Sequence, residues 1–123
     1  MNINGLEPNQ LAVNRGSMLT FGVKRKNGET FKAGDIIRVK VMEAYNVENV
    51  VIQKDFKAEN DIDVMPIVLL GSETKIGEYI NQPIDYWYEI ELFPDTDYTQ
   101  TILGYDDEPK IFTLRPEGGE KKW

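Results

Sequence analysis

Three groups of acidic residues carry the side chains that could most readily bind a cation. They are Asp61 with Asp63, Asp95 with Asp97, and the run Asp106-Asp107-Glu108. Loop carboxylates bind Ca²⁺ when roughly six to eight oxygens converge, but none of the three groups has the spacing of an EF-hand loop. Aspartate also stabilises turns by hydrogen-bonding to its own backbone. Turn formation is the favoured interpretation, and we predict neither a metal nor a cofactor.

Glu89 and Glu91 form another kind of acidic pair, because residues two apart on a strand point to the same face. Glycoside hydrolases use two carboxyl groups that lie roughly 5–9.5 Å apart. A sandwich of 123 residues offers little cleft, however, and nothing in the sequence marks either carboxylate as desolvated. We therefore interpret both as solvated strand residues.

The chain contains neither histidine nor cysteine. Without histidine a Ser-His-Asp triad is impossible, and the commonest general base is missing. Without cysteine there is no disulfide, no thiolate nucleophile and no Cys-ligated zinc. We therefore predict that the protein is not an enzyme and that it assembles in a reducing compartment.

Four aromatic residues are the candidate contacts with a partner, because tryptophan and tyrosine dominate the energetics of protein interfaces. They are Trp87, Tyr98, Tyr105 and Trp123. Trp87 points to the opposite side of its strand from the tyrosines before and after it. It could stack on a sugar ring or anchor a partner, but large aromatic side chains are usually buried. The favoured interpretation places Trp87 under a loop or a neighbouring subunit.

The formal net charge is −7, from 14 basic and 21 acidic residues. Binding to nucleic acid or to anionic lipid requires clustered lysine and arginine. We therefore predict neither a nucleic acid nor a membrane as a partner. The longest apolar run, 67–70, is far too short to cross a bilayer. The first residues lack the charged and apolar regions of a signal peptide, so none is expected.

The clearest structural pattern is the run 84–92, in which apolar residues alternate with mostly charged ones. Such alternation predicts a strand with one buried face, because successive side chains point to opposite sides. Shorter runs of this type occur at 11–13, 19–23, 36–42, 50–56, 100–103 and 111–114. This pattern predicts an all-β, immunoglobulin-like antiparallel β-sandwich of about seven strands. At most one short helical turn is expected, at 72–77 with Ser72 as its cap.

Four local signals predict how the strands are arranged. Asn27-Gly28 predicts a hairpin, because both residues tolerate positive φ. The segment 45–49 interrupts the alternation and is predicted to be a connection. Lys54 interrupts the apolar face of its strand, which favours an edge position. Pro66 lacks a backbone donor, which favours an edge strand or a bulge.

The length of 123 residues is that of one ordinary domain, and no repeat or linker divides the chain. We expect a single β-sandwich domain over 11–116. The polar ends predict a flexible arm at 1–10 and a flexible tail at 117–123.

Six short motifs occur along the chain in an order that is also found in a known family. They are Leu19-Thr20-Phe21-Gly22-Val23, Asn27-Gly28, Thr74-Lys75-Ile76-Gly77, Pro83-Ile84-Asp85-Tyr86-Trp87-Tyr88-Glu89-Ile90-Glu91-Leu92, Thr101-Ile102-Leu103-Gly104-Tyr105-Asp106-Asp107 and Phe112-Thr113-Leu114-Arg115-Pro116-Glu117. Together they resemble small β-sandwich proteins encoded in prophages of Gram-positive bacteria. Those proteins are similar to the N-terminal immunoglobulin-like domain of phage upper-baseplate proteins.

The resemblance implies a structural or assembly protein of a phage or prophage particle, associated with the tail or baseplate, without catalytic residues. Its partners would be other phage structural proteins or further copies of itself. It would be made in the host bacterial cytoplasm, and whether it is built into the virion stays open. The alternative function is that of a carbohydrate-binding module that uses exposed aromatic side chains.

Overall fold

The computed structural model describes residues 10–25, 28–103 and 110–117, and these fold almost entirely into β-strands. The elements in chain order are β1 (Leu11–Asn14), β2 (Leu19–Val23), β3 (Ile36–Glu43), β4 (Asn46–Lys57), β5 (Met65–Leu69), α1 (Gly71–Thr74), β6 (Ile84–Leu92), β7 (Gln100–Leu103) and β8 (Lys110–Arg115). The prediction of an all-β sandwich with at most one helical turn is confirmed. Among the described residues, no helix has the length and apolar character needed to span a membrane.

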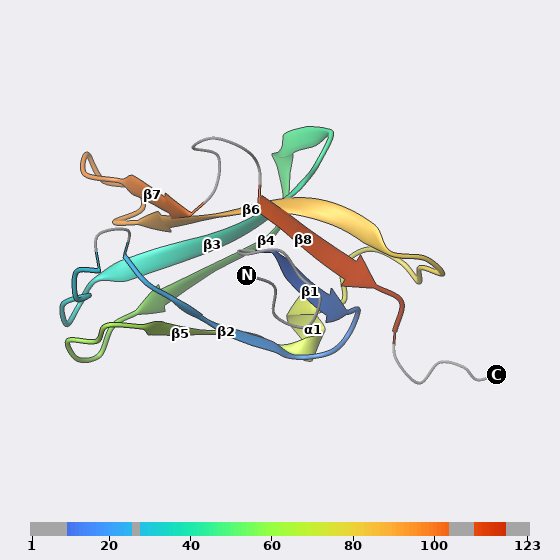
Figure 1. Cartoon of the computed structure of the whole chain (residues 1–123). Coiled ribbons are helices and arrows are strands. Elements are labelled where there is room, and N and C mark those ends of the chain that lie inside the picture. The colour runs from blue at the N-terminus through green and yellow to red at the C-terminus, as the bar shows by residue number, and fades with distance from the viewer. Residues whose placement is uncertain (1–9, 26–27, 104–109, 118–123) are drawn as a thin grey trace.

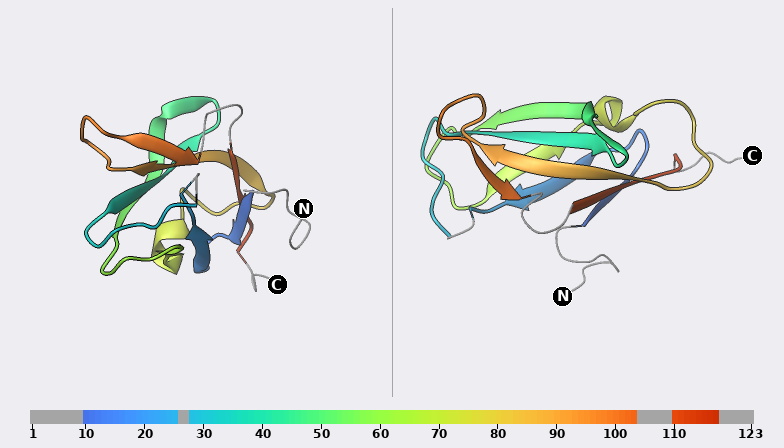
Figure 2. Two further views of the ribbon diagram at one scale, coloured as in Figure 1. Left: turned by 60° about the vertical axis from the view of Figure 1, so that its left-hand side comes forward. Right: turned by 90° about the horizontal axis from the view of Figure 1, so that it is seen from above.

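The strands form two layers (Figures 1 and 2). One layer is a six-stranded sheet in the order β1-β8-β6-β3-β4, with β7 also paired to β6, and the other consists of β2 and β5. In the view of Figure 1, β2 and β5 lie below the long strands β3 and β6. The order β8-β6-β3-β4 opposite β2-β5 follows strands G-F-C-C′ opposite B and E of a variable-type immunoglobulin domain.

The core lies between the two layers and follows the predicted alternation. Val39 of β3 pairs with Ile90 of β6, Val41 pairs with Tyr88, and all four side chains are buried. Ile67 of β5 is also fully buried and belongs to the same hydrophobic cluster. Each such side chain stabilises the fold by roughly 1.5–3 kcal/mol. Burial also raises the pKa of the Tyr88 hydroxyl, because the ionised form would lose its hydration.

One strand pair departs from the predicted antiparallel arrangement. β1 runs parallel to β8, with Leu11 opposite Phe112 and Val13 opposite Leu114. The antiparallel prediction is wrong for this pair. After β1 the chain crosses to the other layer to form β2. The direction of β1 is therefore not fixed by a hairpin connection to a neighbouring strand.

The hairpin predicted at Asn27-Gly28 is wrong. The strand before it, β2, pairs with β5 instead of with the segment that follows the turn. Phe31 in that segment forms only an isolated bridge with Ile62. A turn is still present, because Gly28 N donates to Arg25 O at 3.0 Å and Gly28 has φ +72°. Asn27 itself lies outside the described residues.

The connection predicted at 45–49 is also wrong, because β4 already begins at Asn46. Glu43 pairs with Asn46, so the turn between β3 and β4 consists of Ala44 and Tyr45 alone. The ladder is irregular on both sides of Met42, and this end of the hairpin bends away from the sheet (Figure 1). Bulges of this kind bend a strand and increase its twist. We call residues 44–50 the β3–β4 tip.

Both predicted edge positions are confirmed. β4 ends the six-stranded sheet, and β5 belongs to a sheet of only two strands. Lys54 points from β4 toward the other layer, where its Nζ donates to Val68 O at 2.9 Å and pairs with Glu73 Oε1 at 2.8 Å. An inward-pointing charge on an edge strand opposes pairing with another chain.

The helical turn lies at α1, but its cap differs from the one predicted. Leu70, not Ser72, occupies the N-cap position. Glu73 Oε1 accepts a hydrogen bond of 2.7 Å from Leu70 N and satisfies a donor at the start of the helix. The same carboxylate pairs with Lys54, and these two contacts lower its pKa, with the Lys54 hydrogen bond the larger cause.

A cluster of buried polar groups joins the β1–β2 turn to α1 and to the end of β8. Arg15 Nε donates to Ile76 O at 2.9 Å, and its Nη1 pairs with Glu117 Oε1 at 2.7 Å. Thr74 Oγ1 donates to Ser17 O at 2.8 Å. We call this group the end cluster. Glu117 is the first residue of the predicted tail, and residues 118–123 lie outside the described residues.

Candidate interaction face

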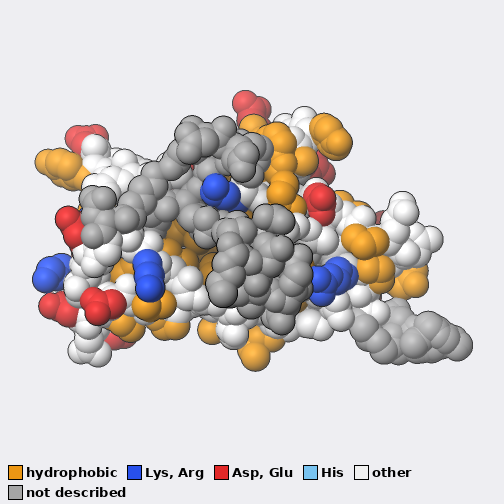
Figure 3. All heavy atoms as spheres, viewed as in Figure 1, with side chains coloured by type: hydrophobic (Ala, Val, Ile, Leu, Met, Phe, Trp, Pro, Cys, Tyr) orange, Lys and Arg blue, Asp and Glu red, His pale blue; other side chains and the backbone are white. Residues whose placement is uncertain are grey.

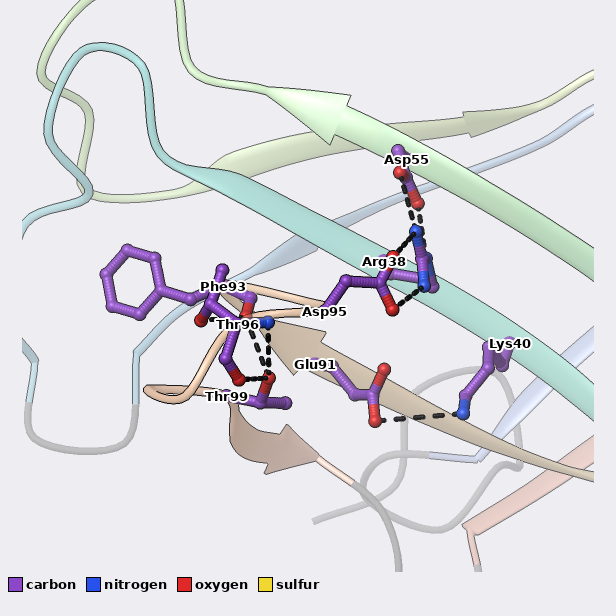
Figure 4. A network of polar contacts seen from close by, with 8 residues as sticks. All are labelled: Arg38, Lys40, Asp55, Glu91, Phe93, Asp95, Thr96 and Thr99. Carbon is purple, nitrogen blue, oxygen red and sulfur yellow. Dashed lines mark hydrogen bonds and ion pairs between the residues drawn. The ribbon is translucent and has the colours of Figure 1, made fainter.

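The outer face of the six-stranded sheet, which points away from β2 and β5, carries a network of ion pairs over one half of its surface. Arg38 of β3 pairs through Nε with Asp55 Oδ1 at 2.7 Å and through Nη2 with Asp95 Oδ2 at 2.9 Å (Figure 4). Asp55 lies on β4, and Asp95 lies on the loop after β6. Arg38 therefore connects a neighbouring strand to a loop across the surface of the sheet.

Arg38 and Asp95 stabilise each other's ionised forms. Hydrogen bonding to Arg38 lowers the pKa of the Asp95 carboxyl, with the attraction of the Arg38 charge as the next cause. Hydrogen bonds to Asp55 and Asp95 raise the pKa of Arg38. A general acid needs the opposite environment, in which burial raises the pKa of a carboxyl group. This network is therefore suited to positioning and not to proton transfer.

Glu89 and Glu91 are bound to a lysine of the neighbouring strand. Lys40 Nζ lies 3.2 Å from Glu89 Oε2 and 3.7 Å from Glu91 Oε2. Their side chains are only 13% and 18% exposed, so the interpretation as solvated residues is wrong. Lys40 stands directly opposite Glu89 in the ladder. The sequence does not reveal this contact, because nothing local to β6 shows that β3 lies beside it.

The loop between β6 and β7 is fixed by its own hydrogen bonds (Figure 4). Thr96 Oγ1 and Thr99 Oγ1 each donate to Phe93 O at 2.8 Å. Phe93 and Asp95 adopt positive φ values of 55° and 63°, which non-glycine residues rarely do. Tyr98, one of the predicted contacts, lies on this loop with 76% of its surface exposed. The loop thus presents a tyrosine from an ordered backbone.

The other half of the outer face is apolar. Trp87 of β6 lies between Met42 of β3 and Ile111 of β8 in the ladder, and Met42 pairs with Val50 of β4. Met42 is buried, while Trp87 and Ile111 are half-buried. Trp87 is therefore covered in part, which falls between the two interpretations made from the sequence. Among the predicted contacts, Tyr105 and Trp123 lie outside the described residues.

β7 and β8 pair with successive parts of the same edge of β6. Ile90 pairs with Leu103, whereas Tyr88 pairs with Lys110. Tyr105 and the acidic run 106–108 lie between these two strands in the sequence and outside the described residues.

Asp61 and Asp63 bind neighbouring segments of the chain. Asp61 Oδ1 accepts a hydrogen bond of 2.9 Å from Ala33 N, and Asp63 Oδ1 accepts one of 2.7 Å from Thr30 Oγ1. These aspartates do not bond to their own backbone, as the turn interpretation supposed, but hold the β4–β5 connection against the segment before β3. In the part of the chain that the structure describes, no group of acidic residues could hold a metal ion.

The β3–β4 tip contains the most exposed aromatic side chain of the described residues, and the sequence analysis did not single it out. Tyr45 is fully exposed, at 103%, and Val47 and Val50 are also exposed. Hydrophobic side chains gather at the upper right of the space-filling view, around this tip (Figure 3). The signal for this exposed site was the apolar character of the segment 45–49, which we had interpreted only as a break in the alternation.

A groove lies at the other end of β4, between β4 and β5. Its volume is about 430 Å³, and it is lined largely by apolar side chains, among them Phe56, Ala58, Ile62, Met65 and Pro66. Ile62 remains 36% exposed at its margin. The groove falls within the size range of small binding pockets, roughly 300–1,000 Å³.

Comparison with protein-family models, with curated proteins and with solved structures gives no significant match. The surfaces of this chain must therefore indicate its function. These surfaces are an ion-paired and partly apolar sheet face, two exposed tyrosines on tight loops, and an apolar groove.

Proposed function

We propose that this protein is a non-enzymatic structural or assembly protein of a phage or prophage particle, associated with the tail or baseplate, and that it acts through protein–protein contacts. The observation that carries the proposal is the exposure of apolar side chains on tight, ordered turns, above all Tyr45 on the two-residue turn between β3 and β4. Exposed aromatic side chains on a rigid backbone lose little entropy on binding, and tyrosine is enriched at the centres of interfaces.

The pairing of the acidic residues supports a role without catalysis. Glu89 and Glu91 share the ammonium group of Lys40, and Asp95 is bound to Arg38. The hydrogen bond from Arg38 and the charge of Arg38 lower the pKa of Asp95, and a carboxyl group with a lowered pKa donates protons poorly near neutral pH. The sequence also lacks histidine and cysteine, the side chains most often used as base and nucleophile.

The alternative, a carbohydrate-binding module, is supported less well. A platform that stacks on several successive sugar rings needs aromatic side chains on one surface. Tyr45 follows the end of β3 that pairs with Tyr86, whereas Tyr98 follows Leu92, which pairs with the opposite end of β3. The six-residue difference along β3 separates the two ends by about 20 Å at ~3.3 Å per residue. The exposed tyrosines on these two loops thus do not form one platform.

The proposal places the protein in the host bacterial cytoplasm during particle assembly. Its partners are other phage structural proteins or further copies of itself. Nucleic acid and membrane surfaces are not proposed as partners, because the net charge of −7 would oppose binding to phosphate groups.

The test is to induce particles from a bacterium that encodes this chain, purify them and measure their protein content by mass spectrometry. We expect the chain at a fixed, stoichiometric amount per particle, or a failure of tail or baseplate assembly when its gene is deleted. Normal particles that lack the chain, formed with and without the gene, would overturn the proposal. A parallel pull-down on cell-wall glycans, with Trp87→Ala as the comparison, distinguishes the carbohydrate-binding alternative.

A further inference from the structure

The two-stranded sheet of β2 and β5 has a free edge on each strand. In an antiparallel ladder, successive residues direct their backbone N–H and C=O groups alternately toward the partner strand and away from it. Pro66, which has no N–H group, stands opposite Gly22 in a continuous ladder. The hydrogen bonds of this ladder therefore join Phe21 to Ile67, while Thr20 and Gly22 direct their backbone groups away from β5.

A hydrogen bond from the other layer gives the same orientation independently. Lys54 Nζ of β4 donates to Val68 O at 2.9 Å, so this carbonyl group points away from β2. Val68 stands opposite Thr20 in the ladder. The two residues of such a pair point away from each other, so the backbone groups of Thr20 face the free edge of β2.

The backbone groups on the free edge of β2 are open to solvent. Thr20 and Gly22 are both exposed. Among the described residues, neither backbone makes a hydrogen bond outside the β2–β5 ladder. Two N–H and two C=O groups thus face water at a spacing of two residues, about 6.6 Å at ~3.3 Å per residue. The backbone of another extended strand has the same repeat and supplies both donors and acceptors.

The opposite side of the sandwich is protected against the addition of a strand. On β5, Pro66 lacks a donor, and the outward carbonyl group of Val68 is already bound by Lys54. The Lys54 side chain lies between the free edges of β4 and β5, and inward-pointing charges of this kind oppose pairing. β2, by contrast, contains no proline, bulge or charged residue. The free edge of β2 therefore lacks the features that block pairing on the other side.

The larger sheet extends past β2 on its free side (Figure 2). Lys54 links β5 to β4, and from β4 the sheet continues through β3 and β6 to β8 and β1. A strand added to β2 would lie beneath the strands at this end of the larger sheet. One extended segment fits such a site, whereas a second folded sandwich would bring the extended sheets of two copies into collision.

We infer that β2 binds an extended segment of a partner protein, which adds as a strand to its free edge through the backbone groups of Thr20 and Gly22. In this mode of recognition, main-chain hydrogen bonds supply affinity and alternate side chains supply specificity. Leu19 and Phe21 are partly buried and pack against the core. Partner side chains on the same face of the added strand are therefore expected to be apolar.

The inference rests on the proposed function in one respect, because the partner would be another structural protein of the particle. The first test is amide hydrogen exchange of the free chain, measured by NMR. The Thr20 and Gly22 amides should exchange within about tenfold of the rate of an unfolded peptide. The Phe21 amide, which is bound to β5, should exchange at least about a hundredfold more slowly than these two.

The second test adds a strand as a probe, a capped peptide with the sequence of residues 17–25. With the phenylalanine of the peptide opposite Phe21 in an antiparallel register, apolar side chains face one another and no like charges meet. We expect a dissociation constant on the order of 1 mM and slower amide exchange at Thr20 and Gly22. The matched control is the same peptide N-methylated at its threonine and glycine amides. It keeps every side chain but loses the donors that face β2, and it should bind at least about tenfold more weakly.

A pair of proline variants tests the edge from the side of the protein. Thr20→Pro removes one outward donor of β2 and should weaken binding of the peptide at least about tenfold. Gln53→Pro makes the same change at an exposed position of β4 and should leave binding unchanged. Its amide also points away from β3, because Ala58 N donates to Asp35 O and the orientation alternates along the strand. Circular dichroism checks that both variants fold, and the N-methylated peptide tests the edge without any change to the protein.

The inference is wrong if the Thr20 and Gly22 amides are already protected in the free chain. Protection at every concentration would mean that the chain itself occupies the edge, and protection only at high concentration would mean that a second copy does. The inference is also wrong if the peptide does not bind, or if its N-methylated form binds equally well. None of these results would overturn the proposed function, because they involve no particles. Absence of the chain from particles would likewise leave the binding of an extended segment to β2 intact.

Discussion

Two arginines of this protein have similar partners but different surroundings. Arg15, in the end cluster, is 7% exposed, and its guanidinium binds Glu117 and the backbone carbonyls of Ile76 and Gly77. Arg38, on the outer face, binds two carboxylates, and its side chain is 16% exposed beside acids that are 46% and 75% exposed. Water can replace the partners of Arg38 far more easily than those of Arg15.

The comparison shows that burial, and not the number of contacts, decides what each arginine contributes to stability. A buried polar group that loses its partner keeps the full penalty of desolvation. An exposed ion pair exchanges its partner for water and salt at little cost. We therefore expect the contacts of the end cluster to contribute strongly to the stability of the fold. Substitutions of charged residues on the outer face should be tolerated without loss of the fold.

The largest effect is expected from Arg15→Met, which retains much of the apolar stem but removes every donor of the guanidinium. Two carbonyls and the Glu117 carboxylate lose their partner, and the free energy of unfolding should fall by about 3 kcal/mol. Urea denaturation measures the change. Arg15→Lys keeps the charge but not the forked geometry and should recover only part of the loss. If the free energy of unfolding of Arg15→Met fell by less than about 1 kcal/mol, the end cluster would not differ from the outer face in its contribution to stability.

Gly71→Ala tests the packing of the same region without changing a charge. A Cβ at Gly71 would lie 2.5 Å from the backbone oxygen of Gly16, so the β1–β2 turn would have to move away from α1. We expect a loss of about 2 kcal/mol, in the range of overpacked sites. Gly34→Ala provides a contrast. A Cβ added at Gly34 would meet no atom within 4 Å, so the strain would come from its φ of +95° and not from packing. Equal stability of Gly71→Ala and the unaltered protein would contradict close packing at this position.

Arg38→Met makes on the outer face the change that Arg15→Met makes in the end cluster. The loss should be at most about 1 kcal/mol, because solvent and salt screen exposed ion pairs. Raising the salt concentration to 1 M should reduce the difference between variant and unaltered protein still further. The same measurement on Arg15→Met should show little dependence on salt. A large, salt-independent loss for Arg38→Met would mean that the outer face is as constrained as the end cluster.

The smallest effect concerns pH and the Lys54–Glu73 pair between the layers. The folded protein lowers the pKa of Glu73 below its usual value of 4.5. The pair therefore contributes stability above that value, and this contribution is lost as the pH falls through the folded pKa. Glu73→Gln should cost roughly 0.5 kcal/mol at pH 7, because the pair is only partly shielded from water, and less at pH 3. An unchanged difference between pH 7 and pH 3 would contradict the assignment to the carboxylate.

The sequence predicted those features that depend on neighbours along the chain. Alternation in 84–92 correctly indicated a strand with a buried face, and Lys54 and Pro66 correctly indicated edges, because each signal acts through the backbone of its own strand. The helical turn was found near the right place, although Leu70 and not Ser72 occupies its cap.

The pairing of strands could not be predicted in the same way. Asn27-Gly28 is compatible with a hairpin, but β2 pairs with β5 more than forty residues away, because the two strands together cover the core on that side. The partners of Glu89, Arg15 and Arg38 follow from such distant contacts and have no signature in the sequence. The exposure of Tyr45 was likewise hidden, since a tyrosine beside valines has the composition of a buried segment.

The sequence alone thus determined that this protein is built from strands and which faces of these strands are apolar. It also determined that histidine and cysteine are not among its side chains. These properties depend only on the types of side chain and on their alternation along each strand, which has a period of two residues. Only the tertiary structure decided which charges meet, which arginine is buried, and that a tip and a groove lie at opposite ends of one strand. Those outcomes depend on which strands lie side by side, and that choice minimises the free energy of the whole chain and not of any one segment.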